Sequence, residues 1–225
     1  MPYETLLDVI RDPLFAATDL ALRRGQHISA DSDPFAYEFL DTTREHVEEF
    51  YAAYGVQLVC GREGYFYLVP DRNLVPAPLG SRHLSMLEML AGQALALMRL
   101  EPKWLATGGR IPDAKVLELL ENLLGPEALL KLSRPRRRGR DDEQDAKKLR
   151  ENLGTALNTL ERLGFLRREG RGENATVTPL KSIMRFADPV RSSEPLDEAL
   201  ARLIREGEIE DIAEEAPDAA EAGDR

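Results

Sequence analysis

The sequence predicts an α+β fold, mostly helical, in which one order of elements occurs twice. Three observations carry this prediction. Apolar residues recur at helical spacing along most of the chain, two pairs of short strand-forming runs are each joined by a glycine-containing turn, and each pair follows two helices. A chain of 225 residues with 43% hydrophobic residues is long enough for one large domain or two small ones.

The first half is expected to hold a helix, a short extended segment, two more helices and a hairpin. These elements are expected at residues 6–24, 27–30, 32–55 (divided near Asp41), 56–60 and 65–70. Ser32 or Asp33 is a suitable N-cap for the second helix because a short polar side chain can accept from the first free N–H groups. Thr42 and Glu45 form a capping-box pattern, which predicts that a third helix starts there.

The second half repeats this order after a proline-rich break at residues 71–80. A core helix, a short strand, a helix, a one-turn segment, a basic loop, a long helix and a hairpin are expected at residues 82–100, 108–112, 113–125, 126–133, 134–140, 141–163 and 165–179. Asp113 is predicted to cap the helix that Gly125 ends.

Helix, strand, helix, helix and hairpin is the order of a winged helix, so we predict tandem winged-helix domains with short two- to three-stranded wings. The expected boundaries are residues 1–75, 76–190 and 191–225. The last segment is predicted to hold a short docking helix at 195–206, striped by leucines, and then a disordered acidic tail. The alternative is a generic α+β protein with two hairpins.

Composition restricts the cellular setting. Cys60 is the single cysteine, so no disulfide can form within the chain, and a reducing compartment is expected. The apolar run at 84–100 contains charged and amide side chains, which favours a buried helix over a membrane span. The N-terminus carries acids where a signal peptide needs basic residues. We therefore expect a soluble, cytoplasmic protein with no membrane contact.

Charge is distributed unevenly along the chain. The net charge is −10, yet residues 131–171 hold 13 basic and 7 acidic side chains. Such a block predicts a site for an anionic partner, and a hairpin beside a helix could hold double-stranded DNA by its phosphates, without reading sequence. The candidate DNA-binding residues are Arg134, Arg136, Arg137, Arg138, Arg140, Lys147, Lys148, Thr155, Asn158, Arg162, Arg167, Arg168 and Arg171.

A solvated helix with an arginine-rich loop is the alternative interpretation of this block. Glu151 lies in the middle of the exposed face and supports that alternative, as does the acidic run 141–143, which could neutralise the loop. The opposite face is expected to be core, because its residues share one side of the helix: Leu149, Leu153, Ala156, Leu160 and Leu163.

Enzyme signatures are missing from the sequence. No phosphate-binding GxxxxGKS/T loop and no GxSxG elbow occurs. His27, His46 and His83 have no ligand partners at metal-binding spacing, so structural or surface roles are expected, and Cys60 is expected to be buried. We predict a non-enzyme with no cofactor and no metal.

Two stretches carry a family resemblance. DPLFAATDLALRRGQHISADS at 12–32 and HVEEFYAAYGVQLVCGREGYFYLVPDR at 46–72 resemble the MukE family, the winged-helix (kite) subunits of the bacterial MukBEF chromosome-condensing complex; RLGFLRREG, SIMRFADPVR and RLIREGE are similar too. The resemblance implies a homodimer that binds the kleisin MukF, regulates the SMC ATPase MukB, contacts DNA and serves chromosome condensation and segregation at the nucleoid.

The chain departs from the family pattern in two places. Its long helix is less basic, with Gly154, Thr159 and Glu161, and its loop at 134–140 is more basic. Aromatic residues of the first half could serve both core and dimer interface: Phe35, Tyr37, Phe39, Phe50, Tyr51 and Tyr54. Three alternatives stay open: a stand-alone transcription regulator, a protein-interaction module without DNA contact, and a MukE-like subunit of a plasmid-defence SMC system.

Overall fold

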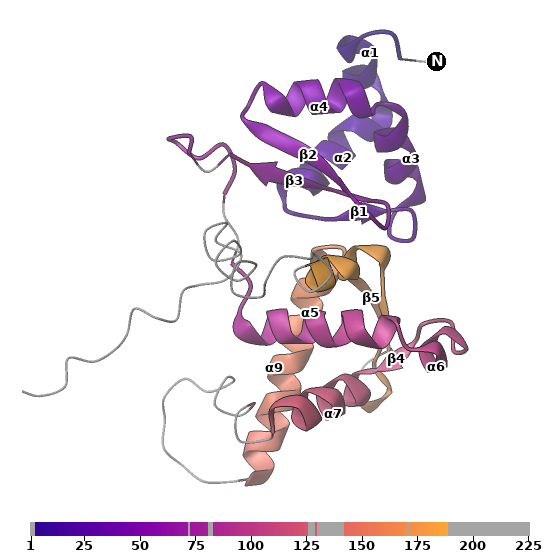
Figure 1. Cartoon of the computed structure of the whole chain (residues 1–225), viewed down its shortest axis with the longest axis vertical. Coiled ribbons are helices and arrows are strands. Elements are labelled where there is room, and N and C mark those ends of the chain that lie inside the picture. Colours follow the sequence, from indigo (N-terminus) through magenta and orange to yellow (C-terminus); the bar gives the residue numbers. More distant parts are fainter. Residues whose placement is uncertain are drawn as a thin grey trace, which may run out of the picture.

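The computed structural model describes residues 3–71, 73–80, 83–125, 129, 142–170 and 172–188. Figure 1 shows two groups of elements, one from each half of the chain, stacked along the longest axis of the molecule. The loop arginines at 134–140, Arg171, the predicted docking helix and the acidic tail lie outside the described residues.

The first half contains four helices and a three-stranded antiparallel sheet. The helices are α1 (Leu6–Arg11), α2 (Pro13–Arg23), α3 (Pro34–Thr42) and α4 (Arg44–Ala52), and the strands are β1 (Ile28–Ser29), β2 (Val56–Gly61) and β3 (Tyr65–Pro70). The sheet order is β1-β3-β2, so the last strand lies in the middle. The predicted strands and hairpin are confirmed.

The single helix predicted at 6–24 is wrong, because Pro13 divides it. Asp12 ahead of the proline is extended (φ −64°, ψ 134°), as expected for a residue that a proline ring excludes from the helical region. Its carboxylate then accepts a hydrogen bond from the Leu14 N–H at 2.8 Å, which caps α2. One residue therefore ends α1 and starts α2.

The predicted caps of α3 and α4 have different outcomes. Asp33 is the N-cap of α3, accepting from the Ala36 N–H at 3.0 Å, as expected. The capping box at Thr42 and Glu45 is wrong, because the break falls at Thr43, whose hydroxyl is buried and donates back to the Phe39 carbonyl at 2.7 Å. The hydroxyl thus points back along α3, and no side-chain hydrogen bond caps α4.

The second half repeats the arrangement. Its elements are α5 (Met86–Arg99), α6 (Pro102–Leu105), β4 (Ile111–Pro112), α7 (Asp113–Leu124), α9 (Asp142–Arg162), β5 (Leu166–Glu169), β6 (Thr176–Pro179) and the 3₁₀ helices η1 (Gly172–Asn174) and η2 (Lys181–Ala187). The sheet order β4-β6-β5 again places the last strand in the middle. Pro112, not Asp113, occupies the N-cap of α7, whereas Gly125 ends the helix as predicted, with φ 79°. The sequence predicted neither α6 nor η2.

Each half has its own hydrophobic core. The expected core helix is confirmed as α5, of which Ala91 and Leu95 are fully buried. Phe186 of η2 packs on Gly92 of α5 so closely that a Cβ there would lie 2.5 Å from the ring. No helix among the described residues is long and apolar enough to cross a membrane.

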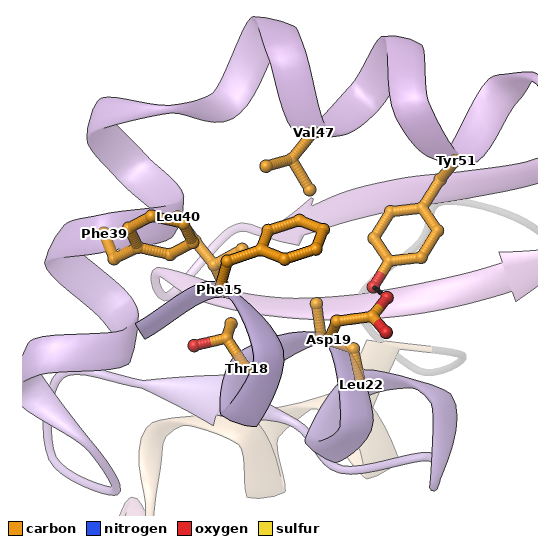
Figure 2. A pocket seen from close by; sticks show the side chains of 8 residues that line it. All are labelled: Phe15, Thr18, Asp19, Leu22, Phe39, Leu40, Val47 and Tyr51. Carbon is orange, nitrogen blue, oxygen red and sulfur yellow. Dashed lines mark hydrogen bonds between the residues drawn. The ribbon is translucent and has the colours of Figure 1, made fainter. Parts of the chain in front are cut away.

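The aromatic residues of the first half are divided between core and surface. Figure 2 shows Phe15, Phe39 and Tyr51 turned toward one another, with the Tyr51 hydroxyl donating to the Asp19 carboxylate at 2.8 Å. Burial is the main cause that raises the pKa of Tyr51, so this phenol stays protonated and keeps its hydrogen bond at neutral pH. By contrast, Phe35 is 70% and Tyr54 51% exposed.

Candidate nucleic-acid interface

The buried face of α9 is as predicted. Its five predicted core residues, Leu149, Leu153, Ala156, Leu160 and Leu163, are all at most 5% exposed, and Leu157 joins them. The helix crosses behind α5 in Figure 1 and packs against both α5 and α7. Because the inner face is fixed by leucine packing, the outward-facing residues are fixed as well.

The outer face of α9 carries a row of polar and basic side chains that we name the cationic stripe. Its members are all exposed predicted residues: Lys147, Lys148, Thr155, Asn158 and Arg162. Beside the stripe, Gly154 has no atom within 4 Å of the position that a Cβ would occupy, so the helix backbone is accessible there. The exposed Glu151 lies within the stripe and reduces its positive charge.

The side chains of the stripe are held loosely. The Thr155 hydroxyl donates to the Glu151 carbonyl at 3.1 Å, and Arg162 donates to the Thr159 hydroxyl at 3.2 Å. Among the side chains that the structure describes, which do not include those of residues 142–145, no carboxylate lies within salt-bridge distance of Lys147, Lys148 or Arg162. The cations are thus available to an external anion as far as the described residues are concerned.

Arg168 of β5 has a structural position that the sequence did not predict. Its side chain is 19% exposed and donates to the Gly154 carbonyl at 3.2 Å, the Asn158 amide oxygen and the Asp113 carboxylate. Its backbone N–H donates to the Glu161 carboxylate at 2.7 Å. The expectation that this side chain is solvated is wrong, because it joins the start of α7, the middle of α9 and the hairpin.

Arg167, the next residue toward α9, faces the other way. It is exposed, and its guanidinium donates to the backbone carbonyl of Asp31 in the first half at 2.9 Å. Adjacent residues of a strand point to opposite faces, which explains why one arginine is enclosed and its neighbour is not. Arg134, Arg136, Arg137, Arg138, Arg140 and Arg171 lie outside the described residues, so their approach to the stripe stays a prediction.

The two halves meet at a polar seam beside the hairpin. The Asp31 carboxylate accepts from the backbone N–H of Lys181 at 2.9 Å, and the backbone N–H of His27 donates to the Leu163 carbonyl at 2.8 Å. Arg99 of α5 approaches Asp31 at 4.0 Å. The first half is therefore hydrogen-bonded to the turn after α9 through Leu163, to β5 through Arg167 and to the start of η2 through Lys181.

His27 is enclosed in this seam. It is 7% exposed, its ring is stacked on Tyr67 with centroids 5.1 Å apart, and Phe165 lies at 4.2 Å. Arg185 can only donate, so its guanidinium 2.6 Å from Nε2 assigns the ring proton to Nδ1, which faces the Leu163 carbonyl at 3.3 Å. Burial, and then the Arg185 charge, lowers the pKa of His27 well below its usual range. The predicted structural role of this histidine is confirmed.

A groove of about 390 Å³ also lies between the halves, lined by the outer side of α2 and by Glu161, Leu166 and Arg167. No sequence signal indicated it, because its walls come from segments far apart in the chain. The depression drawn in Figure 2 is different in kind: its side chains fill it and leave no space for a water molecule. Among the described residues no cluster of three metal-ligating side chains occurs, and Cys60, expected to be buried, is only half-buried.

Comparison of the sequence with known proteins identifies its family. A sequence profile described as the MukE-like family matches residues 1–224. The chain belongs to the MukE-like family. It is 37% identical over 204 residues to the chromosome partition protein MukE of Escherichia coli K12, covering 90% of this chain and 84% of the relative.

Other MukE proteins give the same result. The chromosome partition protein MukE of Mannheimia succiniciproducens is 38% identical over 204 residues, with 90% of this chain and 82% of the relative covered. That of Pasteurella multocida is 37% identical over 204 residues, with 90% and 81% covered. The family resemblance stated from the sequence is thereby confirmed.

Proposed function

We propose that this MukE-like chain is a non-catalytic subunit of a bacterial SMC complex that acts in chromosome partition and contacts DNA through the cationic stripe of α9. The role in chromosome partition rests on family membership, since its relatives carry that name. The DNA contact rests on one observation: three exposed cations lie on one helix face, none with a carboxylate partner among the side chains that the structure describes.

Each half is proposed to be a winged helix. The support is the order helix, strand, two helices and hairpin, together with a sheet in which the last strand is central in both halves. In such a module the helix before the hairpin and the hairpin itself form one surface, which agrees with a stripe on α9 next to Arg167. The stripe offers lysines, one arginine and small polar groups, so it would bind DNA phosphates without recognising the base sequence.

The partners proposed for the chain are those of its family: the kleisin MukF, the ATPase MukB and a second copy of the chain. A dimer through the first half is supported by exposed apolar side chains there, with Leu7 at 52% and Phe35 at 70% exposure. Interfaces are enriched in such residues. Sedimentation of the purified chain at micromolar concentration is expected to show a dimer, and a monomer would contradict this part.

A salt titration of duplex binding tests the DNA contact. Each phosphate contact contributes about −0.9 to the slope of log affinity against log salt. Changing Lys147, Lys148 and Arg162 to Ala together should therefore flatten the slope by about 2 to 3, equally for unrelated duplexes. The assembled complex is used if the subunit alone binds weakly.

A second triple variant provides the control. Arg11, Arg44 and Arg62 are exposed cations of the first half, so replacing them with Ala changes the net charge by the same amount. This variant should leave the slope unchanged. Equal flattening by both variants would mean that overall charge, and no particular face, attracts DNA; an unchanged slope in the stripe variant would refute the site.

A further inference from the structure

One face of α5 is largely apolar, with Leu90 packed against the core and an exposed part at its C-terminal end. The residues on it follow one another at spacings of four, three, four and three: Met86, Leu90, Gln93, Leu97 and Leu100. Leu97 is 53% and Leu100 56% exposed, while the opposite side of the helix lies in the core. Apolar residues alternate at spacings of four and three where one helix packs along another. We name this face of α5 the α5 seam.

The described chain ends close to α5, on the side that faces the core. Phe186 packs on Gly92, in the middle of α5, and the described residues end two positions later at Asp188. An extended chain spans at most about 3.5 Å per residue, so the eight residues from Asp188 to Leu196 can cover about 28 Å. The fourteen residues of α5 are about 21 Å long, so all of α5 is within reach.

The segment that follows has a matching pattern. Leu196, Leu200 and Leu203 are separated by four and then three residues, and Ile204 adjoins them. Twelve residues are too few for a stable helix in water, so a helix with this stripe needs an apolar surface to form. The α5 seam presents such a surface without any charged side chain in its row.

We propose that residues 195–206 of the same chain form a helix that docks on the α5 seam through Leu196, Leu200 and Leu203. The docked helix covers Leu97 and Leu100, so the second half gains one more helix than the described elements include. The acidic stretch from Glu206 onward then begins at the surface of α5. The proposal is independent of DNA binding by the cationic stripe, because it involves a different face.

Cross-linking in the full-length chain tests the contact. In a Cys60→Ser background, the pair Leu97→Cys and Leu200→Cys is oxidised at low protein concentration, and products are resolved on a non-reducing gel and by mass spectrometry. The matched control pairs Leu200→Cys with Leu123→Cys, because Leu123 on α7 is similarly exposed, at 59%. A cross-link within one chain, several-fold more abundant for the seam pair, is expected.

Two results would overturn the proposal. The first is an equal yield of cross-linked product from both cysteine pairs, including no product from either. The second is cross-linking only between two chains, which would assign the α5 seam to a second copy. A stability measurement supplies an independent readout. Leu200→Glu should lower Tm by about 4 to 8 °C, since it removes the burial of one leucine. Ala201→Glu, one residue off the stripe, should leave Tm unchanged; equal shifts in both variants would refute the docking.

Discussion

Substitution of Gly164 by alanine is expected to separate the two halves of the protein locally. Gly164 ends α9 with φ +76°, its N–H donates to the Glu161 carbonyl at 2.9 Å, and the Phe165 N–H donates to the Leu160 carbonyl at 3.0 Å. This is a helix end that requires glycine. An added Cβ would also lie 2.3 Å from the backbone carbonyl oxygen of His27, which lies across the polar seam between the two halves.

Two costs add up at this position. A side chain in the left-handed region costs about 1–2 kcal/mol. The clash involves backbone, which cannot rotate away, so β1 must move and the His27 N–H loses its 2.8 Å bond to the Leu163 carbonyl. A buried polar group without a partner costs about 1–3 kcal/mol. The free energy of unfolding should fall by about 2–5 kcal/mol in total.

Gly25 offers a matched control. It ends α2 with φ +81° and the same pair of hydrogen bonds, but its added Cβ would meet only Leu163 Cδ2 at an ordinary 3.7 Å. Gly25→Ala should therefore show the backbone cost alone, about 1–2 kcal/mol. The two variants should differ by the lost hydrogen bond alone, and at about 2–4 °C per kcal/mol calorimetry should find Tm of Gly164→Ala about 2–12 °C below that of Gly25→Ala.

The outcome that would refute this reasoning is equal destabilisation by the two variants. It would mean that the close approach of His27 to Gly164 contributes nothing to stability, and that the halves are not coupled there. A second observation bears on the same point: amide hydrogen exchange at His27 should accelerate in Gly164→Ala and stay slow in Gly25→Ala.

Three further predictions follow from the same contacts. Folding lowers the pKa of His27 from its usual 6.5, so the unfolded chain binds more protons at acidic pH. The free energy of unfolding, measured with urea, should therefore fall below about pH 6.5, by up to about 1.4 kcal/mol per pH unit. His27→Gln should show a flatter dependence on pH between 6.5 and 5. Arg168→Ala should cost about 2 kcal/mol because it leaves Asp113 and Asn158 without their partner, whereas Arg167→Ala should cost less than about 1 kcal/mol; similar melting curves for both would contradict the enclosed position of Arg168. Truncation after Glu206 should leave Tm unchanged, as its acidic composition cannot build a core, and a large drop would show that the tail packs on the body.

Most of the secondary structure was readable from local signals. Alternating strand residues around a glycine turn specified β2 and β3, and the leucine spacing of α9 specified its buried face. The wrong secondary-structure predictions arose where two local signals compete. Pro13 overrode the apolar period of the first helix, and the Thr43 hydroxyl bonded backward to Phe39 and not forward as a cap.

The sequence identified which basic and polar residues form the candidate interface, but it predicted their positions in space only in part. Lys147, Lys148, Thr155, Asn158 and Arg162 lie exposed on one face because they occupy the side of α9 opposite the leucines, which periodicity dictates. Arg167 and Arg168 look alike in the sequence. They differ because adjacent strand residues point to opposite faces, which turns Arg168 toward Asn158 and toward Asp113, 55 residues earlier in the chain, and turns Arg167 away from both.

By itself the sequence determined the repeated element order, the core faces, the excess of basic side chains at 131–171 and the family. Each of these depends on neighbours within a few residues or on composition. Only the tertiary structure decided that His27 and Asp31 join the two halves through Leu163 and Lys181, that Arg168 is enclosed, and that Leu97 and Leu100 at the end of α5 are exposed among the described residues. Those features arise from groups as far as 150 residues apart in the chain, and no local pattern encodes which distant partner a side chain will meet.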